Sequence, residues 1–120
     1  IERSLNGAGK PVKGSKILIL GAAYKPGIGD TRESPALRII ALLRDLGAEV
    51  AYHDPFVAEL PAQGLESVDL EQGLAAADLL AIVTAHPGVD HEAAVKAVPL
   101  AIDFRGISRG FDDADGVERL

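Results

Sequence analysis

The pattern of apolar and polar positions predicts strands that alternate with helices. Four short segments have the length and composition of strands: 16–20, 49–53, 79–83 and 100–103. Residues 17–20 of the first segment and all of the third are continuous apolar runs, which is typical of strands covered on both faces in a parallel sheet. Three segments between them have the apolar spacing or the capping residues of helices: 35–46, 70–77 and 91–97.

The signals at helix ends are clearest around the first predicted helix. Ser34 can cap its amino end, and Pro35 suits the first helical position. Gly47 stands where a left-handed residue often ends a helix. Residues 56–68 and the tail after Arg105 show no such pattern, so we expect irregular structure in both.

This alternation predicts an α/β domain with three layers, a Rossmann-like fold whose mostly parallel sheet lies between helices. Right-handed crossovers favour the strand order 2-1-3-4. Ligands of such sheets bind beyond the carboxyl ends of the strands, at the crevice where the order reverses. Function is therefore expected in the loops 21–34, 84–90 and 104–108.

Composition narrows the possible functions. A chain of 120 residues suits one domain, and its net charge of −6 argues against a nucleic-acid partner. The absence of Cys excludes disulfides and a Cys nucleophile within this chain. No apolar run reaches a membrane span and no signal peptide is present, which favours a cytoplasmic protein. The chain begins at Ile1 and contains no Met, so we interpret it as a piece of a longer protein.

The loop 21–34 contains two cationic residues but no known glycine-rich nucleotide-binding motif. Its glycines do not form the dinucleotide fingerprint G-x-G-x-x-G, and no phosphate-binding Gly-Lys-Ser/Thr follows. Lys25 can meet a phosphate as a point charge, and Arg32 can bind one with two hydrogen bonds. The alternative is that both are solvated and paired with Asp30 and Glu33.

A third cation follows the fourth strand. Arg105 would lie near the same crevice, or else would pair at the surface with Asp103. Asp54 ends the second strand, where dinucleotide folds place a ribose-binding acid. Because the glycine fingerprint is absent, we interpret Asp54-Pro55 as a turn.

A metal site is not expected. Three histidines, His53, His86 and His91, lack the Cys or paired carboxylates that would complete one. The acidic tail also lacks the spacing of a calcium loop, although it contains Asp112, Asp113 and Asp115.

Six blocks of sequence resemble the C-terminal domain of the UDP-glucose/GDP-mannose dehydrogenase family. They are 17–26, 29–40, 46–50, 52–55, 77–86 and 103–105. The most specific is Tyr24-Lys25 followed by Asp30-Thr31-Arg32-Glu33-Ser34-Pro35. The resemblance implies the end of an inter-domain dimer helix and a linker in 1–14, a UDP-sugar-binding domain in 15–108 and an acidic tail in 109–120.

The resemblance also implies an activity and roles for individual residues. Members oxidise the C6 alcohol of a nucleotide sugar to a carboxylate with two NAD, through a thiohemiacetal and a thioester on a Cys. In the family, an N-terminal domain, outside this chain, binds NAD and contains that Cys. The helix between the two domains forms the interface of a homodimer. By motif, Tyr24, Lys25 and Arg105 would contact the UDP-sugar, and Arg32 would reach NAD.

Three motifs are most similar to the enzymes for UDP-N-acetylmannosamine or UDP-N-acetylglucosamine, which feed polysaccharide and capsule synthesis: the loop 23–26 with Tyr24, the helix start 34–37 and the segment 83–86. The alternatives are a UDP-glucose 6-dehydrogenase and a non-catalytic nucleotide-binding module of the same fold. A response-regulator-like domain is disfavoured, because Gly21-Ala22-Ala23 supplies no acidic cluster after the first strand.

Overall fold

The computed structural model describes residues 13–23, 34–86, 88–103 and 117–119. Within them, a five-stranded parallel sheet has the order β2-β1-β5-β6-β7. Its strands are β1 (Lys16–Leu20), β2 (Glu49–His53), β5 (Leu79–Ile82), β6 (Ala101–Asp103) and β7 (Val117–Arg119). The predicted order 2-1-3-4 of the first four strands is therefore confirmed.

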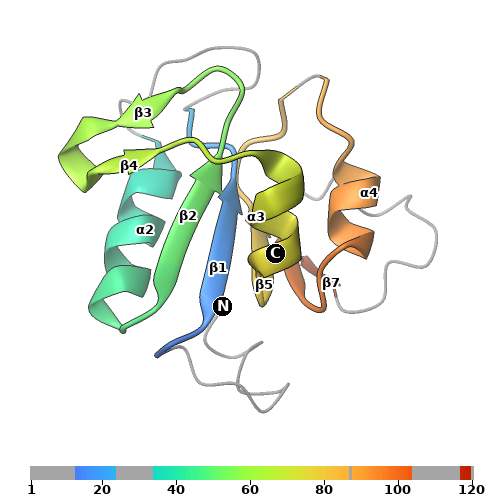
Figure 1. Cartoon of the computed structure of the whole chain (residues 1–120), viewed down its shortest axis with the longest axis horizontal. Helices are drawn as coiled ribbons and strands as arrows, with labels where there is room; N and C mark the ends of the chain where they lie inside the picture. Colours follow the sequence, from blue (N-terminus) through green and yellow to red (C-terminus); the bar gives the residue numbers. More distant parts are fainter. Residues whose placement is uncertain (1–12, 24–33, 87, 104–116, 120) are drawn as a thin grey trace.

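Helices cover both faces of the sheet, as the alternation predicted (Figure 1). They are α2 (Pro35–Asp45), α3 (Leu70–Ala76) and α4 (His91–Lys96). One face of β1 packs through Ile17 and Ile19 into a core that includes Ile40 of α2. The opposite face packs through Leu18 and Leu20 into a core shared with α3 and α4. Consecutive side chains of β1 thus enter different cores, which explains why its four buried residues, Ile17–Leu20, are all apolar.

Local signals fix both ends of α2. The Oγ of Ser34 accepts a hydrogen bond from the backbone N–H of Ala36 at 3.2 Å. At the other end, Gly47 has a φ of 89°. The N–H of Gly47 donates to the carbonyl of Arg44, and the N–H of Ala48 donates to the carbonyl of Leu43. This pair of bonds is a Schellman ending, so the predicted caps are confirmed.

Two segments without a predicted element contain regular structure. Between β2 and α3 lie β3 (Glu59–Leu60), the 3-10 turn η1 (Pro61–Gln63) and β4 (Leu65–Glu66). β3 and β4 pair as an antiparallel hairpin. In the tail, β7 adds a parallel strand beside β6. β3 and β4 have two residues each, and β7 lies in an acidic tail without an apolar run, so sequence periodicity could not reveal them.

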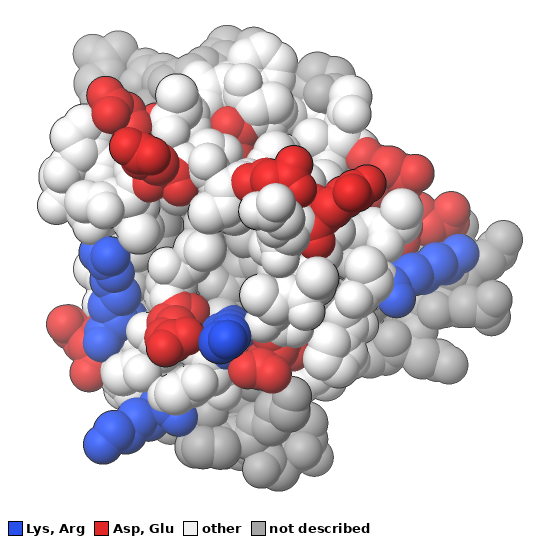
Figure 2. Space-filling model, viewed as in Figure 1, with Lys and Arg blue, Asp and Glu red and all other residues white. Residues whose placement is uncertain are grey.

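Charged side chains do not form a basic face on the side of the molecule that carries α3. Figure 2 shows the Lys and Arg side chains of the described residues standing apart from one another, with acidic side chains between and above them. A surface of this kind does not suit the phosphate backbone of a nucleic acid. Among the described residues, no helix is long and apolar enough to cross a membrane.

Candidate functional site

The candidate site lies at the carboxyl edge of the sheet, where β1 and β5 end side by side. Gly21 follows β1 and has a φ of 91°. Its N–H donates to the carbonyl of His53, at the end of β2, at 2.9 Å. A Cβ on Gly21 would lie 2.1 Å from the carbonyl oxygen of Thr84, which follows β5. Only glycine permits both this backbone conformation and this close approach.

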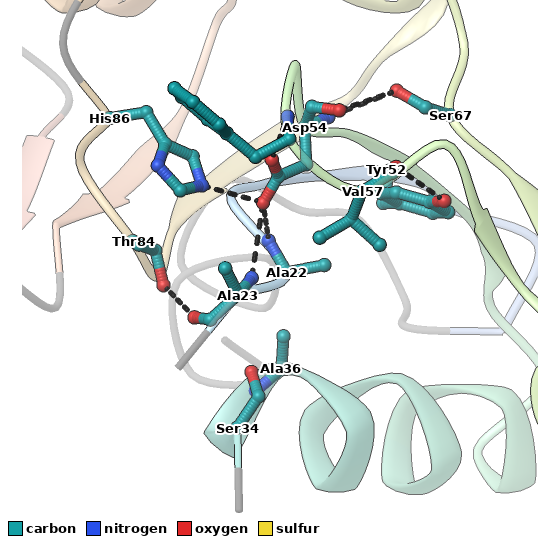
Figure 3. A network of polar contacts seen from close by, with 11 residues as sticks. Ala22, Ala23, Ser34, Ala36, Tyr52, Asp54, Val57, Ser67, Thr84 and His86 are labelled. Atoms are coloured by element: carbon teal, nitrogen blue, oxygen red, sulfur yellow. Dashed lines mark hydrogen bonds and ion pairs between the residues drawn. The ribbon is translucent and has the colours of Figure 1, made fainter. Parts of the chain in front are cut away.

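The two residues after Gly21 are held by a carboxylate from the neighbouring strand. The Oδ2 atom of Asp54 accepts hydrogen bonds from the N–H of Ala22 at 2.7 Å and of Ala23 at 3.0 Å (Figure 3). The carbonyl of Ala23 accepts a hydrogen bond from the Oγ1 of Thr84 at 2.6 Å. The exit of β1 is therefore tied to the exits of both adjacent strands.

Asp54 is the centre of this network. Asp54 is buried, with only 2% of its surface exposed. The Nε2 of His86 lies 2.7 Å from Oδ2, and the N–H of Phe56 donates to Oδ1 at 2.7 Å. The backbone N–H of Asp54 donates to the Oγ of Ser67 at 3.0 Å. With four donors directed at its two oxygens, the buried carboxylate has the partners that a buried charge requires.

An aromatic ring covers one side of this network. The rings of Phe56 and His86 are 4.6 Å apart between centroids and inclined at 41°. His86 is buried, whereas Phe56 is 43% exposed. The Asp54–His86 pair is thus shielded from water by a side chain that itself reaches the surface.

This geometry has a direct consequence for dinucleotide binding. In Rossmann domains that hold NAD, backbone N–H groups after the first strand bind the pyrophosphate. Here the N–H groups of Ala22 and Ala23 are already bonded to Asp54. An anionic pyrophosphate would also meet the negative carboxylate at this point. The described residues therefore do not fit NAD in that position.

The structure corrects the interpretation of Asp54 as a turn residue alone. The turn bond to the N–H of Phe56 is present, but it is one of several. The sequence analysis placed the loop 84–90 at this crevice, but it did not single out Thr84 and His86 within that loop as partners of the exit of β1. The signal that could have identified them is topological. In a parallel sheet of order 2-1-3-4, residues just after the second and third strands flank the exit of the first.

The residues that the sequence assigned to ligands lie outside the described residues. These are Tyr24, Lys25, Arg32 and Arg105. The two residues that flank the segment 24–33 are described: Ala23 is bonded to two side chains, and Ser34 caps α2. The end of the proposed dimer helix and Asp112, Asp113 and Asp115 also lie outside the described part of the chain.

The histidines are not arranged as metal ligands. The Nδ1 of His53 lies 2.8 Å from the carbonyl oxygen of Val68, and His86 pairs with Asp54. In the part of the chain that the structure describes, no group of three His, Asp or Glu side chains could hold a metal ion.

Tyr52 lies beside this network and gives stability a pH dependence. Its buried hydroxyl donates to the carbonyl of Val57 at 2.9 Å. Burial, with a smaller contribution from the charge of Asp54, raises the pKa of Tyr52 from 10.0 to about 12. Because the folded pKa is higher than the unfolded one, this contribution to stability is fully present below pH 10.0. It is lost as the pH rises through about 12.

We therefore expect the free energy of unfolding to decrease between pH 10 and about pH 12, in part because of Tyr52. Tyr52→Phe should lower stability by about 1 kcal/mol at neutral pH, since it removes one buried hydrogen bond. The variant should also show a smaller decrease over the alkaline range. Urea unfolding of both proteins at several pH values measures the difference, and parallel curves would contradict the assigned role.

Comparison with known proteins agrees with the sequence resemblance. Residues 18–109 match the model of the UDP-glucose/GDP-mannose dehydrogenase family, UDP binding domain. UDP-glucose 6-dehydrogenase of Rhizobium meliloti is 34% identical over 111 residues, which cover 85% of this chain and 25% of that protein. UDP-N-acetyl-D-mannosamine dehydrogenase of Pyrococcus horikoshii is 34% identical over 112 residues, which cover 78% of this chain and 25% of that protein. The chain thus spans about a quarter of the length of these relatives.

Solved structures show the same relationship. The UDP-D-ManNAc dehydrogenase of Pyrococcus horikoshii superposes with a TM-score of 0.80 and 31% identity, over 98% of this chain and 28% of that one. An NDP-N-acetyl-D-galactosaminuronic acid dehydrogenase from Methanosarcina mazei also gives a TM-score of 0.80, at 28% identity, over 98% of this chain and 26% of that one. From the match over residues 18–109, and from relatives above 30% identity, we conclude that this chain belongs to the UDP-glucose/GDP-mannose dehydrogenase family, as its UDP binding domain.

Proposed function

We propose that this domain binds the UDP group of a nucleotide sugar within a longer NAD-dependent UDP-sugar 6-dehydrogenase. The observation that carries the proposal is the family match over residues 18–109. A second observation supports it. The N–H groups of Ala22 and Ala23 already donate to Asp54, which disfavours the usual dinucleotide site in this domain. NAD, as the hydride acceptor, is then held by the part of the protein outside this chain.

The proposed ligand contacts are the three residues assigned by motif, which follow β1 and β6 along the chain. Tyr24 and Lys25 come directly after Ala23, which lies at the edge of the sheet where β1 and β5 end. Lys25 supplies a positive charge for the diphosphate of UDP, and Arg105 supplies a second one after β6. These local cations compensate for the net charge of −6, which would otherwise repel a diphosphate.

The reaction that we propose for the longer protein is the oxidation of a sugar C6 alcohol to a carboxylate. Arg32 would contribute to NAD binding from this domain, across the active site. Such a protein would act in the cytoplasm as a homodimer, in the synthesis of polysaccharide or capsule precursors. The isolated chain would be inactive, because it contains no Cys to serve as the nucleophile.

For the sugar, we favour UDP-N-acetylmannosamine or UDP-N-acetylglucosamine, on the basis of the motifs at 23–26, 34–37 and 83–86. The alternative is UDP-glucose, since relatives named for UDP-glucose and for UDP-N-acetyl-D-mannosamine match this chain at the same 34% identity. NADH formation by the full-length protein with each of the three nucleotide sugars distinguishes these substrates.

The roles of Lys25 and Arg32 give a prediction for the full-length protein. Lys25→Ala should reduce kcat/KM for the UDP-sugar at least about tenfold, since a lost charge-assisted contact typically costs ~1.5–3 kcal/mol. Arg32→Ala should mainly raise the KM for NAD. Steady-state kinetics with each substrate varied separately provides the measurement.

The melting temperature of both variants is the control. Substitutions in a polar loop usually change stability by less than ~0.5 kcal/mol, so both should melt near the parent temperature. Variants that unfold, with full activity in the folded remainder, would show that Lys25 and Arg32 are structural ion-pair partners of Asp30 and Glu33.

A further inference from the structure

Both backbone polar groups of Ala23 are held by side chains that follow the two neighbouring strands, β2 and β5. Its N–H donates to the Oδ2 of Asp54 at 3.0 Å, and its carbonyl accepts from the Oγ1 of Thr84 at 2.6 Å. Asp54 and Thr84 are 2% and 1% exposed, so water does not compete for these bonds. The plane of each peptide that flanks Ala23 is thereby restrained, and so is the direction in which the chain leaves β1 (Figure 3).

His86 holds the carboxylate that makes one of these contacts. Its Nε2 lies 2.7 Å from the same oxygen of Asp54 that accepts the Ala22 and Ala23 bonds. Because an ionised carboxylate only accepts hydrogen bonds, Nε2 is the donor. A charge-assisted bond of this length is stronger than one between neutral groups. It restrains the Asp54 side chain in the rotamer that reaches the exit of β1.

We propose that Thr84, Asp54 and His86 are positioning residues for nucleotide binding. By fixing Ala23, they fix the residue from which the chain continues into the loop where we propose, by motif, the UDP contacts Tyr24 and Lys25. This inference rests on the proposed binding of UDP by this domain. The three side chains act through the backbone and need not touch the nucleotide. Their contribution is preorganisation, because a contact residue that starts from a fixed point loses less freedom on binding.

Two substitutions of Thr84 separate positioning from packing. Thr84→Val keeps the shape of the side chain but removes the hydroxyl, whereas Thr84→Ser keeps the hydroxyl. In the full-length protein, Thr84→Val should raise the KM for the UDP-sugar and the Kd for UDP about three- to tenfold, the effect of one hydrogen bond. The KM for NAD and kcat should change less than about twofold. Thr84→Ser should bind UDP like the parent.

Substitutions of His86 test whether its hydrogen bond to Asp54 contributes to this positioning. In His86→Gln, the side-chain amide can donate to Asp54 in place of Nε2, whereas His86→Leu has no donor. We expect His86→Leu to weaken UDP binding and His86→Gln to restore most of it. If His86→Leu does not fold, the comparison of Thr84→Val with Thr84→Ser still decides the question.

Tyr52→Phe is the matched control. It removes another buried hydrogen bond at the end of β2, the one to Val57, and this bond does not involve Ala23. It should lower the melting temperature without changing the KM for the UDP-sugar. If it raises that KM as much as Thr84→Val does, the effect reflects general destabilisation and the positioning role is wrong.

The remaining outcomes separate the two proposals. If the parent protein binds no UDP, the proposed function itself fails. If the parent binds UDP and both Thr84→Val and His86→Leu bind it with unchanged affinity, the function stands and the positioning role is overturned.

Discussion

Gly21→Ala should lower the free energy of unfolding by at least about 3 kcal/mol. Two costs add at this position. The φ of 91° is unfavourable for any residue with a Cβ. The new Cβ would also lie 2.1 Å from the carbonyl oxygen of Thr84, so β1 and β5 would have to move apart where they end. For a domain of this size, the melting temperature should fall by roughly 10–20 °C, which calorimetry or thermal unfolding by circular dichroism would measure.

Gly64→Ala separates these two costs. Gly64 also has a positive φ, 66°, but none of the described atoms lies within 4 Å of an added Cβ. This variant should show only the backbone cost, about 1–2 kcal/mol. Equal losses in Gly21→Ala and Gly64→Ala would mean that the close approach of Gly21 to Thr84 does not contribute.

The second large effect is expected for Asp54→Ala. The substitution leaves the N–H groups of Ala22, Ala23 and Phe56 without their acceptor, and it removes the carboxylate beside the buried His86. Breaking a buried polar network from one side typically costs about 3–5 kcal/mol. The midpoint of urea unfolding should therefore decrease sharply, with little change in the slope of the transition.

An exposed carboxylate with a similar local role provides the control. Asp69 accepts a hydrogen bond from the N–H of Gln72 at 3.1 Å as the N-cap of α3, and this contact is exposed. Asp69→Ala should cost only about 1 kcal/mol, because water can replace the lost acceptor. If Asp54→Ala is as mild as Asp69→Ala, then Asp54 is no more than the turn residue that its sequence context suggested.

The secondary structure that could be predicted from the sequence has either a strong pattern or a strong end signal. Every residue of β5 is buried, so its composition alone identifies a central strand. α2 combines a Ser-Pro start with a glycine end, and both features fix its limits. By contrast, β7 lies in an acidic tail without an apolar run, and its place depends on backbone pairing with β6. Pairing between distant backbones leaves no periodic signal in the sequence.

The candidate site was harder to predict than the sheet, because its contacts join distant parts of the chain. Asp54 and His86 are 32 residues apart, and Thr84 is 61 residues from Ala23. Locally, Asp54-Pro55 looks like a turn, and nothing in its neighbours indicates the partners across the sheet. Those partners follow from the register, in which Leu20 lies beside both His53 and Ile82.

The central claim is that this domain recognises UDP and that NAD is bound elsewhere in the full-length protein. Calorimetric titration of the 120-residue chain with UDP, and separately with NAD, tests it most directly. We predict weak binding of UDP with a Kd near the millimolar range, about −4 kcal/mol, since our proposal assigns the rest of the pocket to the part of the full-length protein outside this chain. No heat of binding should accompany NAD at the same concentrations. Tight binding of NAD without binding of UDP would contradict the account, because it would assign this domain the opposite role.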